Sequence, residues 1–212
     1  MIQTTWGYTI TDADALTDIL TAEEFNTLTA NKYSGDVRIP GNITAASQAV
    51  RNYCGWHVFP GQACELITTA DALSVTRSGS DYLIQLPARF VIGVSSVLFD
   101  AVHDEEWTGD AYEFSFESNG LLRVYDVPAY SRMSKVRIVY TAGVPDGLMG
   151  AVKELVAHRV THALASSSGV TSESAGGMSI TYNANWINSA RASALPDDNK
   201  EVLTPYRLQG VF

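Results

Sequence analysis

The sequence predicts an α+β fold, in which a small α-helical bundle forms the core and carries an inserted, antiparallel β-rich domain. Two segments with apolar residues at helical spacing, 43–56 and 148–166, flank a middle stretch of short alternating runs. A long loop and a short strand are expected after the second helix. With 212 residues, 46% hydrophobic and 17% charged, the chain suits one core with an insert.

These patterns divide the chain into three parts. Residues 1–62 are expected to form the N-terminal helical part of the core, and residues 63–143 the β-rich insert. Residues 144–212 are expected to supply the long helix, the extended loop and strand, and short C-terminal helices that complete the core.

The N-terminal part mixes acidic and apolar residues before the helix predicted at 43–56. Acidic side chains surround apolar ones over the first forty residues, which favours short acidic helices; they are Asp12, Asp14, Asp18, Glu23 and Glu24. In 43–56 the apolar residues recur at helical spacing, with polar residues on the other face. Gly55 is expected to end this helix, and Pro60-Gly61 prevents its continuation.

The middle part has the pattern of strands separated by turns. The expected strands are 65–69, 73–77, 82–86, 94–99, 112–117, 121–127 and 135–141. Asn119-Gly120 predicts a two-residue type I′ hairpin, because both central positions of that turn need positive φ. Its register would place Phe114 opposite Tyr125 and Phe116 opposite Arg123.

The C-terminal part begins with a long amphipathic helix, 148–166. Residues 166–177 are small and polar, so they predict a mobile loop. The next segment, 178–182, alternates as a strand and has no obvious partner within its own segment. Two short helices, at 186–195 and 199–208, are expected to follow.

Charge and composition exclude several classes of function. The net charge of −9 disfavours sequence-blind binding to DNA or to anionic lipid. No apolar run approaches the ~20 residues of a membrane helix, and the first residues do not resemble a signal peptide, so we expect a cytoplasmic start and no membrane partner. Cys54 and Cys64 are expected to be free and buried.

One helix face carries residues that can bind a metal. Glu154, His158 and His162 repeat every four residues and share a face, a geometry that permits Zn²⁺. The zincin motif is absent, so the favoured interpretation is a polar face that meets solvent or another subunit. Ala151 and Ala165 on that side would allow a neighbouring helix to approach closely. Arg159, in contrast, falls within the apolar stripe and must reach solvent or a carboxylate.

Other charged groups have simple explanations. The acidic stretch between Asp100 and Glu117 could suggest a calcium site, but its spacing does not match an EF-hand, and a solvated connection explains it better. Lys135 and Arg137 share a strand face that more often meets water or an acidic neighbour than a phosphate. Nucleophile and phosphate-loop motifs are absent, so neither an enzyme nor a cofactor is predicted.

Three segments resemble the head-tail connector family of tailed bacteriophages, also called adaptor or head completion proteins. Residues 45–60 are similar to the family's early helix, which ends in Tyr-Cys-Gly-Trp before a proline. Residues 169–182 resemble the loop and strand after its long helix, and 203–208 resemble its terminal Leu-x-x-Tyr-Arg-Leu. Residues 86–91 are similar to the Leu-Pro-x-x-Pro-Val strand entry of connectors with a β domain, with Phe90 in place of the usual proline.

The resemblance implies a structural protein of the virion neck, assembled in the host cytoplasm. Its subunits would form a homo-oligomeric ring, usually of twelve, that docks on the portal protein and extends the DNA channel toward head-closure (stopper) or tail proteins. DNA would pass without sequence-specific binding. We expect ring contacts from the helix face of Ala151, Glu154, His158 and His162. Contacts with the portal or a neighbouring subunit are expected from Met178, Ile180, Tyr182, Trp186, Tyr206 and Phe212.

Two alternatives from other classes stay open. The β-rich insert could bind a carbohydrate or another ligand, with Trp107 or Tyr130 as a stacking platform. A zinc hydrolase that uses His158 and His162 would require stoichiometric metal. The aromatic interface candidates, Trp186 and Tyr206 above all, could also complete the subunit's own core.

Overall fold

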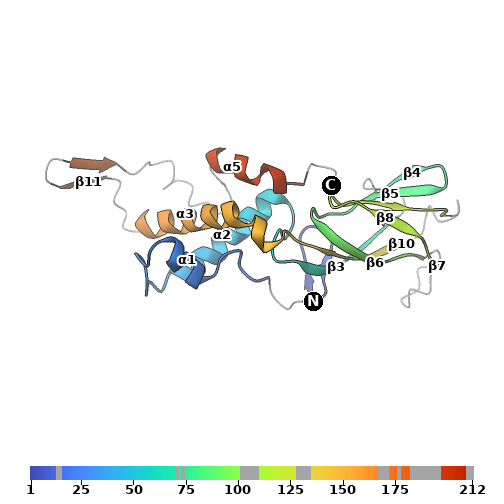
Figure 1. Cartoon of the computed structure of the whole chain (residues 1–212), viewed down its shortest axis with the longest axis horizontal. Helices are drawn as coiled ribbons and strands as arrows, with labels where there is room; N and C mark the ends of the chain where they lie inside the picture. Colours follow the sequence, from blue (N-terminus) through green and yellow to red (C-terminus); the bar gives the residue numbers. More distant parts are fainter. Residues whose placement is uncertain are drawn as a thin grey trace. The chain divides into compact units, whose positions relative to one another are not determined.

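The computed structural model describes residues 1–12, 16–69, 72, 75–100, 110–127, 135–166, 172–175, 178–181 and 197–208. The chain divides into two compact units (Figure 1). The sheet unit comprises Met1–Thr17, Gly55–Asp146 and Tyr206–Phe212, and the helical unit comprises Asp18–Cys54 and Gly147–Pro205. Each unit is therefore built from segments that are far apart in the sequence.

The sheet unit contains a six-stranded antiparallel sheet in the order β1-β2-β3-β10-β6-β7. Buried and more exposed residues alternate along β10, as expected for a sheet with one face on a core. Val136, Ile138, Tyr140 and Ala142 are the buried set of this strand. The strands are β1 (Ile2–Gln3), β2 (Thr9–Ile10), β3 (Gln62–Thr69), β6 (Val91–Asp100), β7 (Asp110–Ala111) and β10 (Lys135–Ala142).

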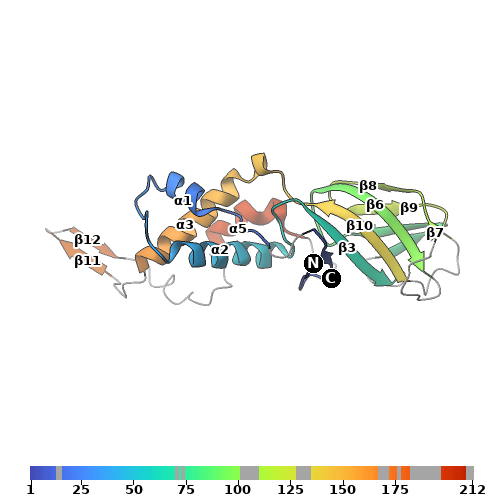
Figure 2. The same cartoon turned by 90° about the horizontal axis from the view of Figure 1, so that it is seen from below.

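A second, four-stranded antiparallel sheet packs against the first within the sheet unit (Figure 2). The ring of Tyr82 in this sheet lies 5.5 Å from the ring of Phe99 in β6, and both side chains are buried. Aromatic contact between the inner faces thus closes a core shared by the two sheets. The order is β4-β5-β9-β8, with β4 (Val75–Ser78), β5 (Asp81–Gln85), β8 (Phe114–Phe116) and β9 (Leu121–Val124).

The predicted register of the β8–β9 hairpin is wrong by one residue. Phe114 lies opposite Val124, and Phe116 lies opposite Leu122. Gly120 has φ +92°, and its N–H donates to the carbonyl of Glu117 at 3.0 Å. Glu117 in turn donates to the carbonyl of Leu121 at 2.8 Å, so the loop spans three residues with Gly at its left-handed position. The two-residue type I′ turn is therefore not formed.

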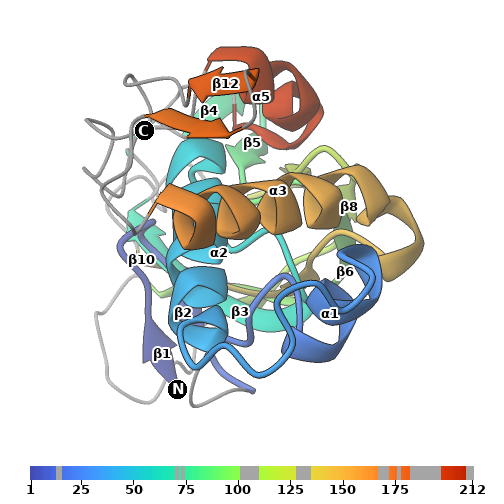
Figure 3. The ribbon, with the colours of Figure 1, turned by 90° about the vertical axis from the view of Figure 1, so that its left-hand side faces the viewer.

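The helical unit packs α2 (Ile39–Cys54) and α3 (Gly150–Ser166) with the shorter α1 (Ala22–Leu28) and α5 (Asp197–Leu203) (Figure 3). Short 3₁₀ turns, η2 (Asp146–Leu148) and η3 (Thr204–Tyr206), precede α3 and follow α5. A capping box starts α1. The Thr21 hydroxyl accepts the backbone N–H of Glu24, and the Glu24 carboxylate accepts the backbone N–H of Thr21. The two long helices agree with the helical periodicity of the sequence, and α2 ends before Gly55 as predicted.

The prediction of a small helical bundle as the core of the fold is wrong. The protein is β-rich, with two antiparallel sheets that enclose their own apolar core, and the described residues contain only four α-helices, two of them seven residues long. The β-branched and aromatic residues of the middle part bury one face among themselves. The chain start also differs from the expected helices, because β1 and β2 extend the edge of the six-stranded sheet.

The strand after the long helix does have a partner in its own segment. β11 (Ser172–Ala175) pairs antiparallel with β12 (Met178–Thr181), with Ala175 opposite Met178. The prediction of an unpaired strand is therefore wrong. The sequence signal for this hairpin is the Gly176-Gly177 pair between the two runs, a preferred pair for a two-residue connection.

Two glycines in the turns of the four-stranded sheet provide a matched test of the β8–β9 turn. Both Gly79 and Gly120 have positive φ, but only at Gly120 would a Cβ collide with backbone, 2.3 Å from the Ala88 carbonyl oxygen. We expect Gly79→Ala to cost about 1–2 kcal/mol of unfolding free energy. Gly120→Ala should cost about 1–3 kcal/mol more. Equal losses in urea denaturation would contradict the close approach at Gly120.

Candidate functional site

The predicted helix face lies on one exposed stripe of α3. Ala151, Glu154 and His158 are exposed, and His162 is half-buried, whereas Val152, Val156 and Val160 on the other side of the helix are buried. Partial burial, together with the nearby His158, lowers the pKa of His162 below its ordinary value of 6.5. The helical period therefore brings these four side chains to one surface, next to the exposed Ala165.

The same stripe does not form a metal centre. Within the described ranges no group of three or more His, Cys, Asp or Glu side chains is arranged to hold a metal ion. Glu154, His158 and His162 thus share a face without converging on one point. Burial lowers the pKa of Arg159, which lies half-buried beside this stripe.

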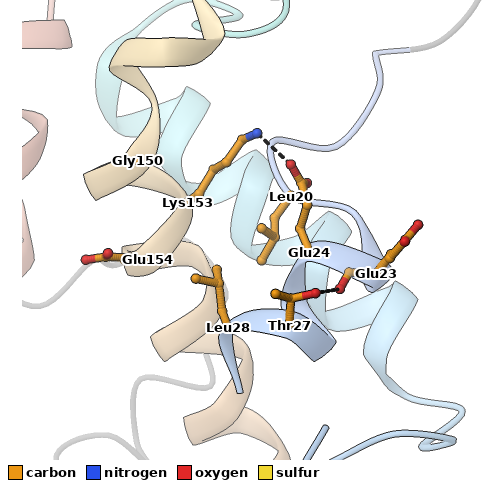
Figure 4. A pocket seen from close by; sticks show the side chains of 8 residues that line it. All are labelled: Leu20, Glu23, Glu24, Thr27, Leu28, Gly150, Lys153 and Glu154. Carbon is orange, nitrogen blue, oxygen red and sulfur yellow. Dashed lines mark hydrogen bonds and ion pairs between the residues drawn. The ribbon is translucent and has the colours of Figure 1, made fainter. Parts of the chain in front are cut away.

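An open groove of about 350 Å³ lies between α1 and α3 in the helical unit (Figure 4). Leu20 is fully buried at its base, and Leu28 on its wall is 49% exposed. Lys153 bridges the two helices with an ion pair to Glu24 at 2.7 Å. Glu23, Thr27, Gly150 and Glu154 complete the lining, so the groove adjoins the exposed stripe of α3 at Glu154. Sequence reasoning missed this groove because α1 and α3 are distant in the chain.

The structure describes three of the six residues that were expected to contact the portal or a neighbouring subunit. Met178 and Ile180 both lie on β12, in the hairpin with β11. Tyr206 is half-buried, and its ring stacks on Phe90 with 5.8 Å between centroids. Three further candidates, Tyr182, Trp186 and Phe212, lie outside the described residues. So do Asp104, Glu105 and Glu106 of the acidic stretch and the stacking candidates Trp107 and Tyr130.

The segment around Tyr206 is held inside the sheet unit by residues from two other parts of the chain. The indole N–H of Trp56 donates to the Tyr206 carbonyl at 2.7 Å, and Arg89 donates to the Arg207 carbonyl at 3.1 Å. Trp56 is fully buried. The side chain of Leu208 lies beside Gly55, where a Cβ would meet it at 3.8 Å. Three of the sequence motifs therefore converge at one place, which their spacing alone does not reveal.

His57 is a buried group with every polar atom satisfied. Its Nε2 donates to the Ala142 carbonyl at 2.8 Å, since a carbonyl only accepts. Its Nδ1 shares a hydrogen bond of 2.7 Å with the Tyr8 hydroxyl, and the hydroxyl oxygen accepts the His57 backbone N–H at 3.1 Å. The imidazole is thus bonded through both ring nitrogens, and it ties the N-terminal segment to the end of β10.

The cysteines and strand cations match their predicted environments. Neither Cys54 nor Cys64 forms a disulfide, and both are buried, as predicted. Burial raises the pKa of Cys64 to about 12, so its thiol stays protonated and unreactive at neutral pH. Arg137 pairs with Glu65 on the neighbouring strand, which confirms an acidic neighbour, and Lys135 is exposed.

The comparisons with known proteins decide the family. A family model described as head completion protein matches residues 16–208, which covers most of both units. The chain belongs to the head completion protein family. A comparison with curated proteins gave no match. None of the helices in the described residues is long and apolar enough to cross a membrane.

Membership gives this head completion protein a structural role in phage head assembly. It places the protein in the virion head or neck, where it interacts with other phage head or tail proteins. The family is structural and is not known for catalysis.

Removal of the Tyr8 hydroxyl tests the buried network. Tyr8→Phe leaves both the Nδ1 and the backbone N–H of His57 without this partner, so we expect a loss of about 1–3 kcal/mol in unfolding free energy. Tyr125→Phe is the control, because the Tyr125 hydroxyl bonds to Ser115 at 2.7 Å at an exposed position. It should cost less than about 0.5 kcal/mol. Similar losses for both variants in denaturant titrations would contradict this account of His57.

The ion pair across the groove predicts a pH dependence of stability. The hydrogen bond from Lys153 is the main cause that lowers the pKa of Glu24 below 4.5. A lowered folded pKa stabilises the protein above the unfolded value and loses that stabilisation as pH falls through the folded pKa. We expect Lys153→Met to cost up to about 1 kcal/mol at pH 7 and less below pH 4. A stability difference that does not change between pH 7 and pH 3 would contradict the pairing.

Proposed function

We propose that this head completion protein is a head-tail connector subunit. It forms a closed ring, of twelve subunits as its family resemblance implies, on the portal vertex. The ring extends the DNA channel toward the head-closure and tail proteins. The observation that carries the proposal is the match of the family model to residues 16–208.

The exposed stripe of α3 supports lateral contact in such a ring. Ala151 and Ala165 present small side chains, and Glu154, His158 and His162 present polar ones, on the same side of the helix. Small residues allow the backbone of a neighbour to approach, and polar groups can set the register of the contact. A ring uses two different faces of each subunit, which close by rotation. We assign the α3 stripe to one of these faces.

The remaining candidates are proposed to dock on the portal or on a neighbouring subunit. Met178 and Ile180 lie on β12 of the β11–β12 hairpin, and Tyr206 keeps part of its surface exposed. Tyr182, Trp186 and Phe212 are proposed for the same contacts from their positions in the sequence.

The net charge is compatible with a channel protein. At −9 the chain repels phosphate on average, so DNA would pass with little attraction to slow it. The same charge disfavours sequence-blind binding of DNA, and we propose from the family resemblance that DNA passes without sequence-specific binding.

Light scattering on the purified protein, alone and mixed with the portal protein of the same phage, tests the proposal. We expect a species of ring size, or a complex that forms only with the portal. A monomer that does not respond to the portal would contradict the proposal and would favour ligand binding by the sheet unit.

A substitution on the α3 stripe tests the lateral contact. Ala151 and Ala45 are both exposed alanines on helices of the helical unit, so Ala151→Arg and Ala45→Arg are a matched pair. We expect Ala151→Arg to raise the concentration needed for ring formation about tenfold or more. Ala45→Arg should leave it unchanged, and both variants should keep the melting temperature of the wild type. Equal ring formation by both would contradict the assignment of the stripe.

A further inference from the structure

The groove between α1 and α3 is an apolar site without an occupant in its own chain's described residues. Leu28, which is 49% exposed, provides apolar surface on its wall. The fully buried Leu20 lies at its base (Figure 4). Its rim is acidic, because Glu23, Glu24 and Glu154 outnumber Lys153. A fitting ligand would therefore combine one apolar side chain with neighbouring positive charge.

The loop that joins α1 to α2 carries such a side chain. Val37 is 92% exposed, the largest exposure among the big apolar side chains of the described residues. At that exposure it does not occupy the groove of its own chain. Arg38 follows it and pairs with Asp36 at 2.6 Å, and Arg38 also donates its backbone N–H to Asp36 at 2.9 Å. These bonds join the two residues that flank Val37, and the Val37 side chain itself lies in solvent.

Charge on this loop is complementary to charge on the groove. Lys32 and Arg38 outnumber Asp36 between α1 and α2, which leaves the loop with excess positive charge. The hydrogen bond from Arg38 lowers the pKa of Asp36 to about 2, so Asp36 keeps its charge well below neutral pH. Opposite net charges on the two surfaces favour their encounter and fix the orientation of the contact.

We propose that Val37 of one subunit inserts into the α1–α3 groove of the next copy of this chain. The inference rests on the proposed ring and names the two surfaces that meet in it. The protruding side chain and the groove are different patches of one unit, which gives a head-to-tail contact that can close by rotation. Gly150 and Glu154 line the groove and belong to α3, so the contact continues onto the exposed stripe of that helix.

Cross-linking of mixed single-cysteine variants tests this contact. Val37→Cys places a thiol on the protruding loop, and Thr27→Cys places one on the exposed wall of the groove. The native Cys54 and Cys64 are buried and need not be removed. A short bismaleimide added to an equal mixture, under the conditions in which rings form, should give a covalent dimer on a denaturing gel. Because each chain carries one new thiol, that dimer can arise only between copies.

The controls separate this inference from the proposed ring. Val37→Cys mixed with Val202→Cys, an exposed apolar position on α5, should give no dimer, and each variant alone should give none. Rings that form without the mixed dimer would overturn the Val37 contact and leave the connector proposal intact. A dimer of Val37→Cys with itself would overturn it too, because it would show a two-fold contact. If light scattering finds neither ring nor portal complex, the connector proposal fails, and the contact fails with it.

A charge substitution gives a second, independent readout. Val37→Asp would place a carboxylate against Glu23 and Glu154, so we expect ring formation to need at least about tenfold more protein. Val202→Asp adds the same charge elsewhere on the helical unit and should have no effect on assembly. Equal assembly by both variants, each with the melting temperature of the wild type, would overturn the proposal.

Discussion

The hydrogen bond from the Trp56 indole to the Tyr206 carbonyl holds together a unit whose chain segments are separated by 150 residues. The sheet unit draws on three stretches of sequence, and each must be tied to the others without a disulfide. Trp56 holds the last stretch, and the adjacent His57 holds the first through Tyr8 and the end of β10 through Ala142. Because these groups are buried, each lost partner leaves an unsatisfied polar atom, which makes the assembly of segments cooperative.

Close backbone contact next to this junction explains the glycines there. A Cβ on Gly143 would lie 2.4 Å from the Cα of Gly61, so the chain after β10 passes directly against the chain before β3. Gly143 and Val144 then donate to the carbonyls of Phe90 and Val58 at 3.1 and 2.8 Å. The residues before β3, before β6 and after β10 are thereby joined, which places the Leu-Pro-Ala-Arg-Phe motif beside Trp56 and Tyr206.

Local periodicity predicts most elements of this fold but not how they combine. The helices α2 and α3 and the strands β3, β4, β5, β6, β8, β9 and β10 follow from their own residue patterns, whereas the two-residue β7 lies in none of the strands expected from the sequence. The strands β1 and β2 have only two residues each, and β11 consists of Ser-Glu-Ser-Ala, so neither pattern carries a strand signal. The β8–β9 register depends on one extra loop residue. The α3 stripe was predictable because the helical period alone determines which residues share a face. The groove could not be predicted, because it forms only where α1 and α3, distant in the chain, come together. The exposure of Val37 likewise depends on the tertiary structure around it and not on its neighbours in the sequence.

Assembly into a ring places a particular demand on the strength of each contact. The exposed ion pairs of this protein, such as Arg38 with Asp36, contribute little free energy in water, so the proposed contact must take its energy from apolar surface and its orientation from charge. One valine in a shallow groove is a weak contact. A closed ring, however, has one more contact than the open chain of the same subunits, and the last contact forms within one particle at high effective concentration. Because each contact is weak, wrongly joined subunits can dissociate before the ring closes, and the closed ring is still stable.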